Sequence, residues 1–224
     1  MNIELRVSGS AHEAFDEAAA LLAEAAGRGG HVALSGGSTP RPAYEAAARL
    51  APDWSRLEVW WADERCVPPD DERSNYRLVR ESLLDRLERS PAIEHRVRGE
   101  LDPEEAADAY EHELRGVVFD LVVLGIGRDG HTASLFPNDP GVDELDRRAV
   151  AVRRADVDRV TVTIPPLNAS ETVVFLTVGA EKADAVARAF GEDPSPATPA
   201  SLVRSASGTT IVLLDRAAAA DLPN

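Results

Sequence analysis

Short apolar runs alternate with alanine-rich stretches along the whole chain. The apolar runs have the length of buried strands, because a strand covered on both faces reads as an almost continuous apolar segment. The alanine-rich stretches place their apolar residues at helical spacing. Strands are predicted at 3–7, 31–35, 57–61, 119–124, 159–164, 172–178 and 209–214. Helices are predicted at 11–27, 41–50, 75–88, 103–115, 180–190 and 216–220.

This order of elements predicts the fold class. Strands that alternate with helices favour an α/β fold, with a doubly wound, mostly parallel sheet and helices on both of its faces. The 224 residues are enough to bury the core of one such unit, and we expect a single domain over 1–224. The proline-rich segment 193–199 is interpreted as a surface loop before the last strand and not as a domain boundary.

The segment after the strand 119–124 holds the most informative chemistry. Residues 125–137 read Gly-Ile-Gly-Arg-Asp-Gly-His-Thr-Ala-Ser-Leu-Phe-Pro, so Asp129 and His131 closely follow a buried strand. Ligands bind at the carboxyl edge of open α/β sheets, and glycines let the backbone approach them closely. An acid–base histidine with a supporting carboxylate is the resulting hypothesis. The alternative is a tight connection in which His131 is structural.

A second glycine turn closes the strand 31–35. Residues 34–40 read Leu-Ser-Gly-Gly-Ser-Thr-Pro, and a helix is expected to begin at Pro40 with Ser or Thr as its cap. Exposed N–H groups at a helix start attract anions, which makes Gly37, Ser38 and Thr39 candidate phosphate ligands. The turn lacks the Gly-Lys-Ser/Thr of a P-loop and the spacing of a dinucleotide fingerprint. An ordinary capped turn is the alternative.

A third polar segment, the charged triplet 63–65, follows the strand 57–61. Its charges could neutralise one another in an ion network. Arg65, however, also has the planar donor fork that suits a phosphate or a carbonyl oxygen that gains negative charge. Trp60 and Trp61 point to opposite faces if the strand persists, so we interpret both as packing residues.

Composition narrows the range of partners. The formal net charge is −15, so neither nucleic acid nor an anionic membrane is expected as a partner. An anionic ligand must then bind to a local cluster of cations, and Lys182 is the only lysine of the chain. A single cysteine, Cys66, excludes an internal disulfide, and we interpret it as an inert small residue. The sequence has neither a signal-peptide pattern nor an apolar run long enough to span a membrane, so a cytoplasmic location is expected.

Five segments resemble those of one enzyme family, in the same order. They are Ser-Gly-Gly-Ser-Thr-Pro, Trp-Ala-Asp-Glu-Arg, Ser-Asn-Tyr, the histidine segment 125–137, and Arg-Val-Thr-Val-Thr-Ile-Pro-Pro-Leu-Asn over 159–168. On these residues the chain resembles the 6-phosphogluconolactonase family, which is grouped with glucosamine-6-phosphate deaminase. The likeness continues through Gly-Ala-Glu-Lys at 179–182 to Leu-Asp-Arg-Ala-Ala at 214–218.

The resemblance implies a Rossmann-like three-layer α/β fold and hydrolysis of 6-phospho-D-glucono-1,5-lactone to 6-phosphogluconate, a step of the oxidative pentose phosphate pathway. His131 would activate water as a general base, Asp129 would orient the imidazole, and Arg65 would offset charge on the carbonyl oxygen. No cofactor is expected, because the lactone is an activated ester. No metal is expected either, because no recognisable set of metal ligands is present in the sequence. A monomer is expected.

The resemblance also implies residues that bind the sugar phosphate. Those expected at the phosphate are Gly37, Ser38, Thr39 and Lys182. Lys182 is included because it matches the family's Gly-x-x-Lys pattern. Arg159 is a further candidate for the phosphate, or a solvated arginine at a strand end. Asp63 and Asn75 are expected to form hydrogen bonds with sugar hydroxyls.

The sister deaminase is the main alternative. Its histidine segment continues as Asp-Gly-His-Ile/Leu-Ala-Phe-Asn-Glu-Pro, and the glutamate supports opening of an amino-sugar ring. Leu135 and Phe136 occupy the corresponding positions here, which favours the lactonase. A sugar-phosphate sensor without activity is the third hypothesis. Regulators of that kind carry a DNA-binding helix-turn-helix segment, for which this chain has neither room nor basic charge.

Overall fold

The computed structural model describes residues 2–223. The strands of this part of the chain are β1 (Asn2–Ser8), β2 (Gly30–Leu34), β3 (Leu57–Trp61), β4 (Asp63–Arg65), β5 (Ile93–His95), β6 (Leu121–Leu124), β7 (Ala149–Val152), β8 (Arg159–Val162), β9 (Thr172–Thr177) and β10 (Thr209–Asp215). Its α-helices are α1 (Ala11–Arg28), α2 (Arg41–Leu50), α3 (Asn75–Ser82), α4 (Pro103–Glu113), α5 (Ile164–Asn168) and α6 (Ala183–Phe190). Short 3₁₀ turns lie at Leu84–Arg86, Pro140–Val142, Ala180–Lys182 and Pro199–Leu202.

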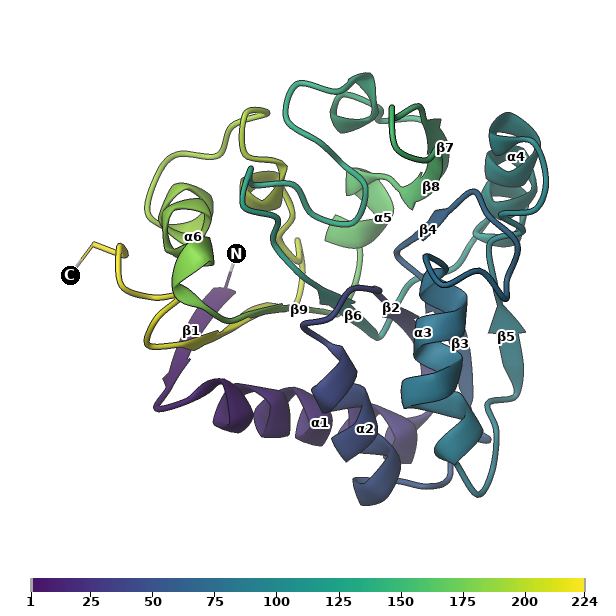
Figure 1. Ribbon diagram of the computed structural model, residues 1–224, viewed down its shortest axis with the longest axis horizontal. Helices are drawn as coiled ribbons and strands as arrows, with labels where there is room; N and C mark the ends of the chain where they lie inside the picture. Colours follow the sequence, from purple (N-terminus) through teal and green to yellow (C-terminus); the bar gives the residue numbers. More distant parts are fainter. Residues whose placement is uncertain (1, 224) are drawn as a thin grey trace.

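The described strands form two sheets (Figure 1). The larger has the order β1-β10-β9-β6-β2-β3-β5, and all of its neighbouring strands are parallel. The smaller, β4-β8-β7, is antiparallel. The chain moves from β2 outward to β3 and β5, returns to β6 beside β2, and then continues in the other direction to β9 and β10. The order of the large sheet therefore reverses between β2 and β6.

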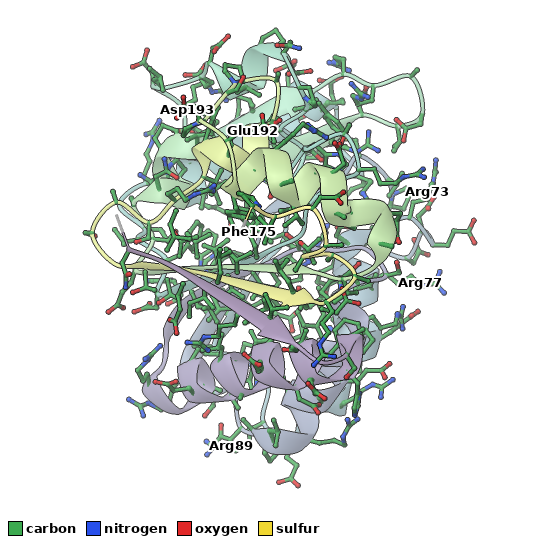
Figure 2. All side chains as sticks on the ribbon, turned by 90° about the vertical axis from the view of Figure 1, so that its left-hand side faces the viewer. Arg73, Arg77, Arg89, Phe175, Glu192 and Asp193 are labelled. Carbon is green, nitrogen blue, oxygen red and sulfur yellow. The ribbon has the colours of Figure 1, made fainter. Side chains whose placement is uncertain are left out.

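Helices cover both faces of the large sheet, as predicted. One apolar core lies between the sheet and α1, α2 and α3, and it includes Trp61. The other core includes Trp60 and packs against α4, α5 and α6. The two tryptophans therefore point to opposite faces and are packing residues, which confirms their interpretation. Figure 2 shows Phe175 of β9 inside the fold, whereas charged residues such as Arg89 and Asp193 lie at its periphery.

Local sequence explains how the longest helix begins and ends. α1 is capped by Ser10, whose side chain accepts a hydrogen bond from the N–H of Glu13. It ends at Arg28 and is followed by the C-cap Gly29. Gly29 has a φ of +85°, which residues with a side chain rarely adopt. Among the described residues, no helix is both long enough and apolar enough to cross a membrane.

One predicted strand belongs to the other sheet, and one predicted helix does not form. The strand predicted at 159–164 ends at Val162 and belongs to the small antiparallel sheet, because the two prolines after Ile164 start α5. The helix predicted at 216–220 is wrong. Residues 216–222 form hydrogen-bonded turns in which Asp215 Oδ1 accepts from the N–H of Ala218. Although the segment is rich in alanine, it is too short for its few hydrogen bonds to offset the unfavourable free energy of helix nucleation.

Two predicted helices are shorter than expected. The helix predicted at 75–88 ends at Ser82 and is followed by a 3₁₀ turn, because Leu83 leaves the helical conformation with φ of −133°. The helix predicted at 180–190 begins as a 3₁₀ turn and becomes α-helical only at Ala183. The fold class is unaffected, since the large sheet and its two helical layers agree with the prediction.

Candidate active site

An open cleft lies at the carboxyl ends of β9, β6, β2 and β3. Strand order reverses here, and in open parallel sheets ligands bind at such a point. Most of the residues expected at the site line this cleft: Gly37, Ser38, Thr39, Asp63, Arg65, Asn75, His131 and Lys182. Residues far apart in the sequence are therefore brought together as the predicted parallel sheet requires.

Asp129 supports the histidine from outside the cleft lining. Its Oδ1 lies 2.6 Å from His131 Nδ1 and also accepts the backbone N–H of His131 at 3.1 Å. Burial opposes the charge on Asp129, but the contacts with His131 outweigh burial and keep the pKa of Asp129 below its usual value. An ionised carboxylate can only accept, so Nδ1 carries the proton and Nε2 is left as the acceptor.

Gly127 makes room for this pair. A Cβ at Gly127 would lie 2.1 Å from His131 Nδ1 and 2.6 Å from Asp129 Oδ1. Two backbone hydrogen bonds close the turn, from Gly127 N–H to His131 O at 2.8 Å and from Gly130 N–H to Gly127 O at 2.9 Å. A glycine is needed at 127 because the imidazole and the carboxylate pack directly on its backbone.

Phe136 lies against the histidine. The ring centroids of Phe136 and His131 are 4.7 Å apart, and the guanidinium carbon of Arg154 lies 4.0 Å from the centroid of the Phe136 ring. Leu135 is fully buried and Phe136 nearly so. The two positions that distinguish the deaminase motif therefore hold packed apolar side chains, which cannot transfer protons.

The turn after β2 contributes backbone and hydroxyl groups. α2 begins at Arg41 with Pro40 as its N-cap, so the predicted cap by Ser or Thr is wrong. Ser38 and Thr39 lie in the turn before the helix and line the cleft. Gly37 has a φ of +94°, in the left-handed region that favours glycine. Neither side chain caps the helix, and both residues border the cleft.

Lys182 enters the cleft from the 3₁₀ turn before α6. Its Nζ donates to the carbonyl oxygen of Ile126 at 2.8 Å, at the start of the histidine loop. Burial lowers the pKa of Lys182, and the nearby Arg128 acts in the same direction. A cation held at this position is suited to an anionic ligand.

Asp63 links three of the segments that build the site. It is buried on β4, where its Oδ1 accepts from Asn75 Nδ2 at 3.1 Å and its Oδ2 from Ser134 Oγ at 2.7 Å. Asn75 Nδ2 also donates to the backbone carbonyl of Asp63 at 2.8 Å. A Cβ on Gly36 would collide with the Asn75 side chain, 1.8 Å from its Oδ1. Each carboxylate oxygen of Asp63 keeps a further acceptor position for a ligand hydroxyl.

Unpaired polar atoms are concentrated at the cleft. In residues 2–223, six buried side-chain nitrogen or oxygen atoms have no hydrogen-bond partner within the protein. Four of them belong to cleft-lining residues: Ser35 Oγ, Arg65 Nε, Asn75 Oδ1 and Thr177 Oγ1. Buried polar groups are nearly always paired, so this concentration indicates a site for a polar ligand.

Besides Asp129, which contacts His131, the structure leaves Arg159 and Cys66 outside the cleft lining. Arg159 lies outside the cleft lining as residues 2–223 define it, and its guanidinium forms hydrogen bonds with Asp156 at 2.7 and 3.0 Å. Cys66 is half-buried, and burial raises the pKa of its thiol to about 11. Among the described residues, no group of three or more His, Cys, Asp or Glu side chains is arranged to hold a metal ion.

Sequence reasoning missed two charged residues that support the site. Glu64 is 2% exposed, and its carboxylate accepts hydrogen bonds at the start of α3. Arg188 of α6 donates to the carbonyl oxygen of Arg128 at 3.1 Å and to Thr198 Oγ1 at 2.8 Å, so it holds the histidine loop from the side. The sequence carries no signal for either role, since each depends on a contact between distant segments.

Comparisons with known proteins identify the family of this chain. The family model described as glucosamine-6-phosphate isomerases/6-phosphogluconolactonase matches residues 6–212. A 6-phosphogluconolactonase of Synechocystis sp. is 40% identical over 204 residues, which cover 86% of this chain and 85% of that protein. The crystal structure of a 6-phosphogluconolactonase from Thermotoga maritima is 33% identical with a TM-score of 0.81, covering 96% of this chain and 99% of that one. The chain belongs to the glucosamine-6-phosphate isomerase/6-phosphogluconolactonase family.

The fold alone does not separate the two activities of this family. A monomeric glucosamine-6-phosphate deaminase superimposes with a TM-score of 0.84, covering 99% of this chain and 100% of that one. Its sequence is only 21% identical, so the likeness shows a shared fold and nothing further. The choice between the activities rests on the side chains around His131.

Gly127→Ala tests how the site is built. The new methyl group would overlap the imidazole and the carboxylate, so the Asp129–His131 pair must separate. We expect lactone hydrolysis to fall about 100-fold or more, the contribution of a positioned general base. The control is Gly27→Ala near the end of α1, where a Cβ meets nothing within 4 Å. Equal activity of the two variants in a kinetic assay would contradict the steric function of Gly127.

Proposed function

We propose that this protein hydrolyses 6-phospho-D-glucono-1,5-lactone to 6-phosphogluconate, as in the oxidative pentose phosphate pathway. The observation that carries the proposal is the Asp129–His131 pair packed against Phe136, because it combines a held base with an apolar residue where a deaminase has glutamate. The relatives named 6-phosphogluconolactonase support it, since they match most of the chain.

In the first step His131 acts as a general base. Nδ1 is bound to Asp129, so Nε2 accepts a proton from water while the water oxygen attacks the carbonyl carbon of the lactone. A carbon–oxygen bond forms, and the π electrons of the carbonyl move onto its oxygen. Asp129 stabilises the imidazolium that results. Arg65, which lines the cleft, offsets the negative charge on the oxyanion.

In the second step the tetrahedral intermediate collapses. The carbonyl forms again, the bond from C1 to the ring oxygen breaks, and the imidazolium returns its proton to the ring oxygen. His131 is neutral at the end, and the product is an open-chain hydroxy acid. No covalent intermediate and no cofactor are required, because the substrate is already an activated ester.

The phosphate group is assigned to Lys182 and the turn formed by Gly37, Ser38 and Thr39. All four line the cleft, and lysine is a suitable point charge for a phosphate. The chain carries a net charge of −15, so the anionic substrate needs such a focused site. Asp63 and Asn75 are assigned to the sugar hydroxyls. Arg159 is bound to Asp156 and is less suited to the phosphate.

We also propose a monomeric enzyme, located in the cytoplasm as expected for sugar-phosphate metabolism, whose partner is the lactone itself. A deaminase would need a further acid–base group, which Leu135 and Phe136 do not supply. A sensor needs only to bind its ligand, so the pairing of His131 with the carboxylate of Asp129 at 2.6 Å favours an enzyme over a sensor.

His131→Asn tests the general base. We expect kcat to fall about 10²–10⁴-fold with little change in KM, because the variant loses proton transfer and keeps the cleft. The matched control is His12→Asn on α1, where the histidine side chain is 82% exposed and also faces an aspartate. Activity near that of the wild type in a folded His131→Asn protein would exclude the mechanism.

Lys182→Ala tests the phosphate site. We expect KM for the phosphorylated lactone to rise about 10-fold or more, the value of a lost hydrogen bond to a charged group, while kcat changes less. Hydrolysis of the unphosphorylated lactone should be nearly unaffected. Arg49→Ala, an exposed cation at the far end of α2, is the control. An equal loss on both lactones would show that Lys182 does not bind the phosphate.

A further inference from the structure

Glu64 is buried between two residues that line the cleft, Asp63 and Arg65. Its Oε1 accepts the backbone N–H groups of Arg65 and Asn75, each at 2.7 Å. Its Oε2 accepts the N–H of Tyr76 at 2.7 Å and Ser74 Oγ at 3.1 Å. One carboxylate therefore joins β4 to the first residues of α3, across the loop that separates them in sequence.

The contacts of Glu64 suit an ionised carboxylate. Three of the four donors are backbone N–H groups, which can only donate. Of the four partners of a protonated Glu64, only Ser74 Oγ could accept its proton, and Ser74 would then lose the bond that it now donates to Glu64. Protonation must therefore weaken the bonds that hold the start of α3.

The charge on Glu64 is costly for the fold. Burial raises the pKa of Glu64 to about 7, although the N–H groups of Tyr76, Asn75 and Arg65 act in the opposite direction. The pKa of Glu64 is higher in the folded chain than in the unfolded chain. The protonated carboxyl therefore contributes fully to stability below its unfolded pKa, and this contribution is lost as the pH rises through about 7. An ionised, buried Glu64 therefore reduces the stability of the fold, which is typical of residues at functional sites.

We propose that Glu64 is a positioning residue, whose carboxylate fixes Arg65 and Asn75 in the cleft by holding their backbone N–H groups together. The proposal rests on the proposed function and adds a residue that does not itself line the cleft. It acts through the two neighbours on which oxyanion stabilisation and sugar binding depend. Loss of the carboxylate separates the start of α3 from β4 and moves Arg65 and Asn75 apart.

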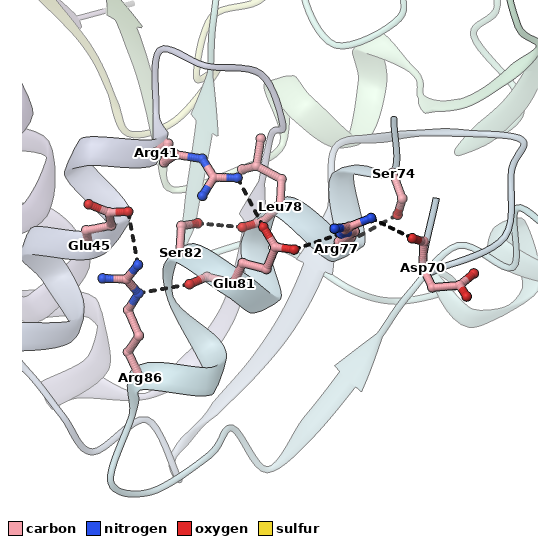
Figure 3. Close-up of polar contacts among 9 residues, drawn as sticks. All are labelled: Arg41, Glu45, Asp70, Ser74, Arg77, Leu78, Glu81, Ser82 and Arg86. Atoms are coloured by element: carbon pink, nitrogen blue, oxygen red, sulfur yellow. Dashed lines mark hydrogen bonds and ion pairs between the residues drawn. The ribbon is translucent and has the colours of Figure 1, made fainter. Parts of the chain in front are cut away.

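The surface contacts of α3 cannot replace this buried anchor. Figure 3 shows Arg41 of α2 and Arg77 both reaching Glu81 on α3, and Arg86 reaching Glu45. These ion pairs are exposed to solvent, and pairs of this kind contribute little to a fixed geometry. The two pairs of Glu81 lie near the end of α3, and the pair of Arg86 with Glu45 joins the following 3₁₀ turn to α2, whereas Asn75 is the first residue of α3.

The position of Glu64 makes substrate binding depend on pH. As the pH falls through about 7, Glu64 takes up a proton and the contact between β4 and α3 weakens. The charged or titratable groups near it are Asp63 and Arg65 on β4, Cys66 beyond that strand, Tyr76 on α3, Arg96 after β5 and Tyr110 on α4. On the paired strand β8, Arg159 lies opposite Arg65. Arg159 is bound to Asp156. Activity should therefore fall as the pH falls through about 7, because Glu64 then loses its hold on Arg65 and Asn75.

Glu64→Gln is the test, because glutamine keeps the shape and does not titrate. The ratio of kcat/KM of the wild type to that of the variant is measured from pH 6 to pH 8, corrected for spontaneous lactone opening. Ionisations of His131 and of the substrate phosphate cancel in this ratio. We expect the ratio to rise about 10-fold with a midpoint near 7, as for a lost hydrogen bond to a charged group. Both kcat and KM should contribute, because Arg65 is assigned to the oxyanion and Asn75 to the sugar.

The matched control is Glu111→Gln. The carboxylate of Glu111 on α4 likewise accepts two backbone N–H groups, those of Arg148 and Ala149, but away from the cleft. Its ratio should stay flat with pH. A flat ratio for Glu64→Gln as well would overturn the proposal. A wild type that does not hydrolyse the lactone at all would instead contradict the proposed function.

A second measurement decides the matter if Glu64→Gln does not fold. In the His131→Asn protein, NMR signals of the N–H groups of Asn75 and Tyr76 and of Arg65 Nε are followed from pH 5 to pH 9. We expect all three to shift with one midpoint near 7. An Arg65 Nε signal that stays constant while the other two shift would show that Glu64 does not position Arg65. This readout does not depend on turnover.

Discussion

The reversal of strand order between β2 and β6 is the constraint on which the site depends. Because the strands of the large sheet are parallel, the segments that leave β2, β3, β6 and β9 all emerge at one edge. The reversal separates the loops after β2 and β6, and the cleft lies there. His131, Arg65 and Lys182 come from three of these segments, so none of them could form the site without the sheet.

Much of this arrangement follows from local sequence, because buried strands and glycine turns leave strong signals. Asp129 and His131 could be placed at a strand end from the apolar run before them, and Gly37 from the turn after β2. Local sequence does not predict contacts between distant segments, nor whether a short segment forms a turn or a helix. The antiparallel pairing of β4 with β8 and the anchor at Glu64 join distant segments, and alanines after Asp215 are too few to nucleate a helix.

The cleft is lined by positively charged side chains, although the chain as a whole carries a negative charge. The protein is strongly acidic, yet Arg65 and Lys182 face the cleft and the carboxylate of Asp63 is bound by Asn75 and Ser134. The carboxylate of Asp63 is thereby engaged in hydrogen bonds, while two cationic side chains border the cleft. The carboxylate that supports His131 is likewise kept out of the cleft. Asp129 contacts His131 Nδ1 but does not line the cleft.

The central claim is that a base held by Asp129 beside an apolar Phe136 makes this site a lactonase and not a deaminase. The most direct measurement offers 6-phosphogluconolactone and glucosamine 6-phosphate separately to one enzyme preparation and follows lactone loss and ammonia release. The account predicts rapid loss of the lactone above its spontaneous rate and no ammonia. Ammonia release at a rate comparable with lactone hydrolysis, or no turnover of the lactone, would contradict it.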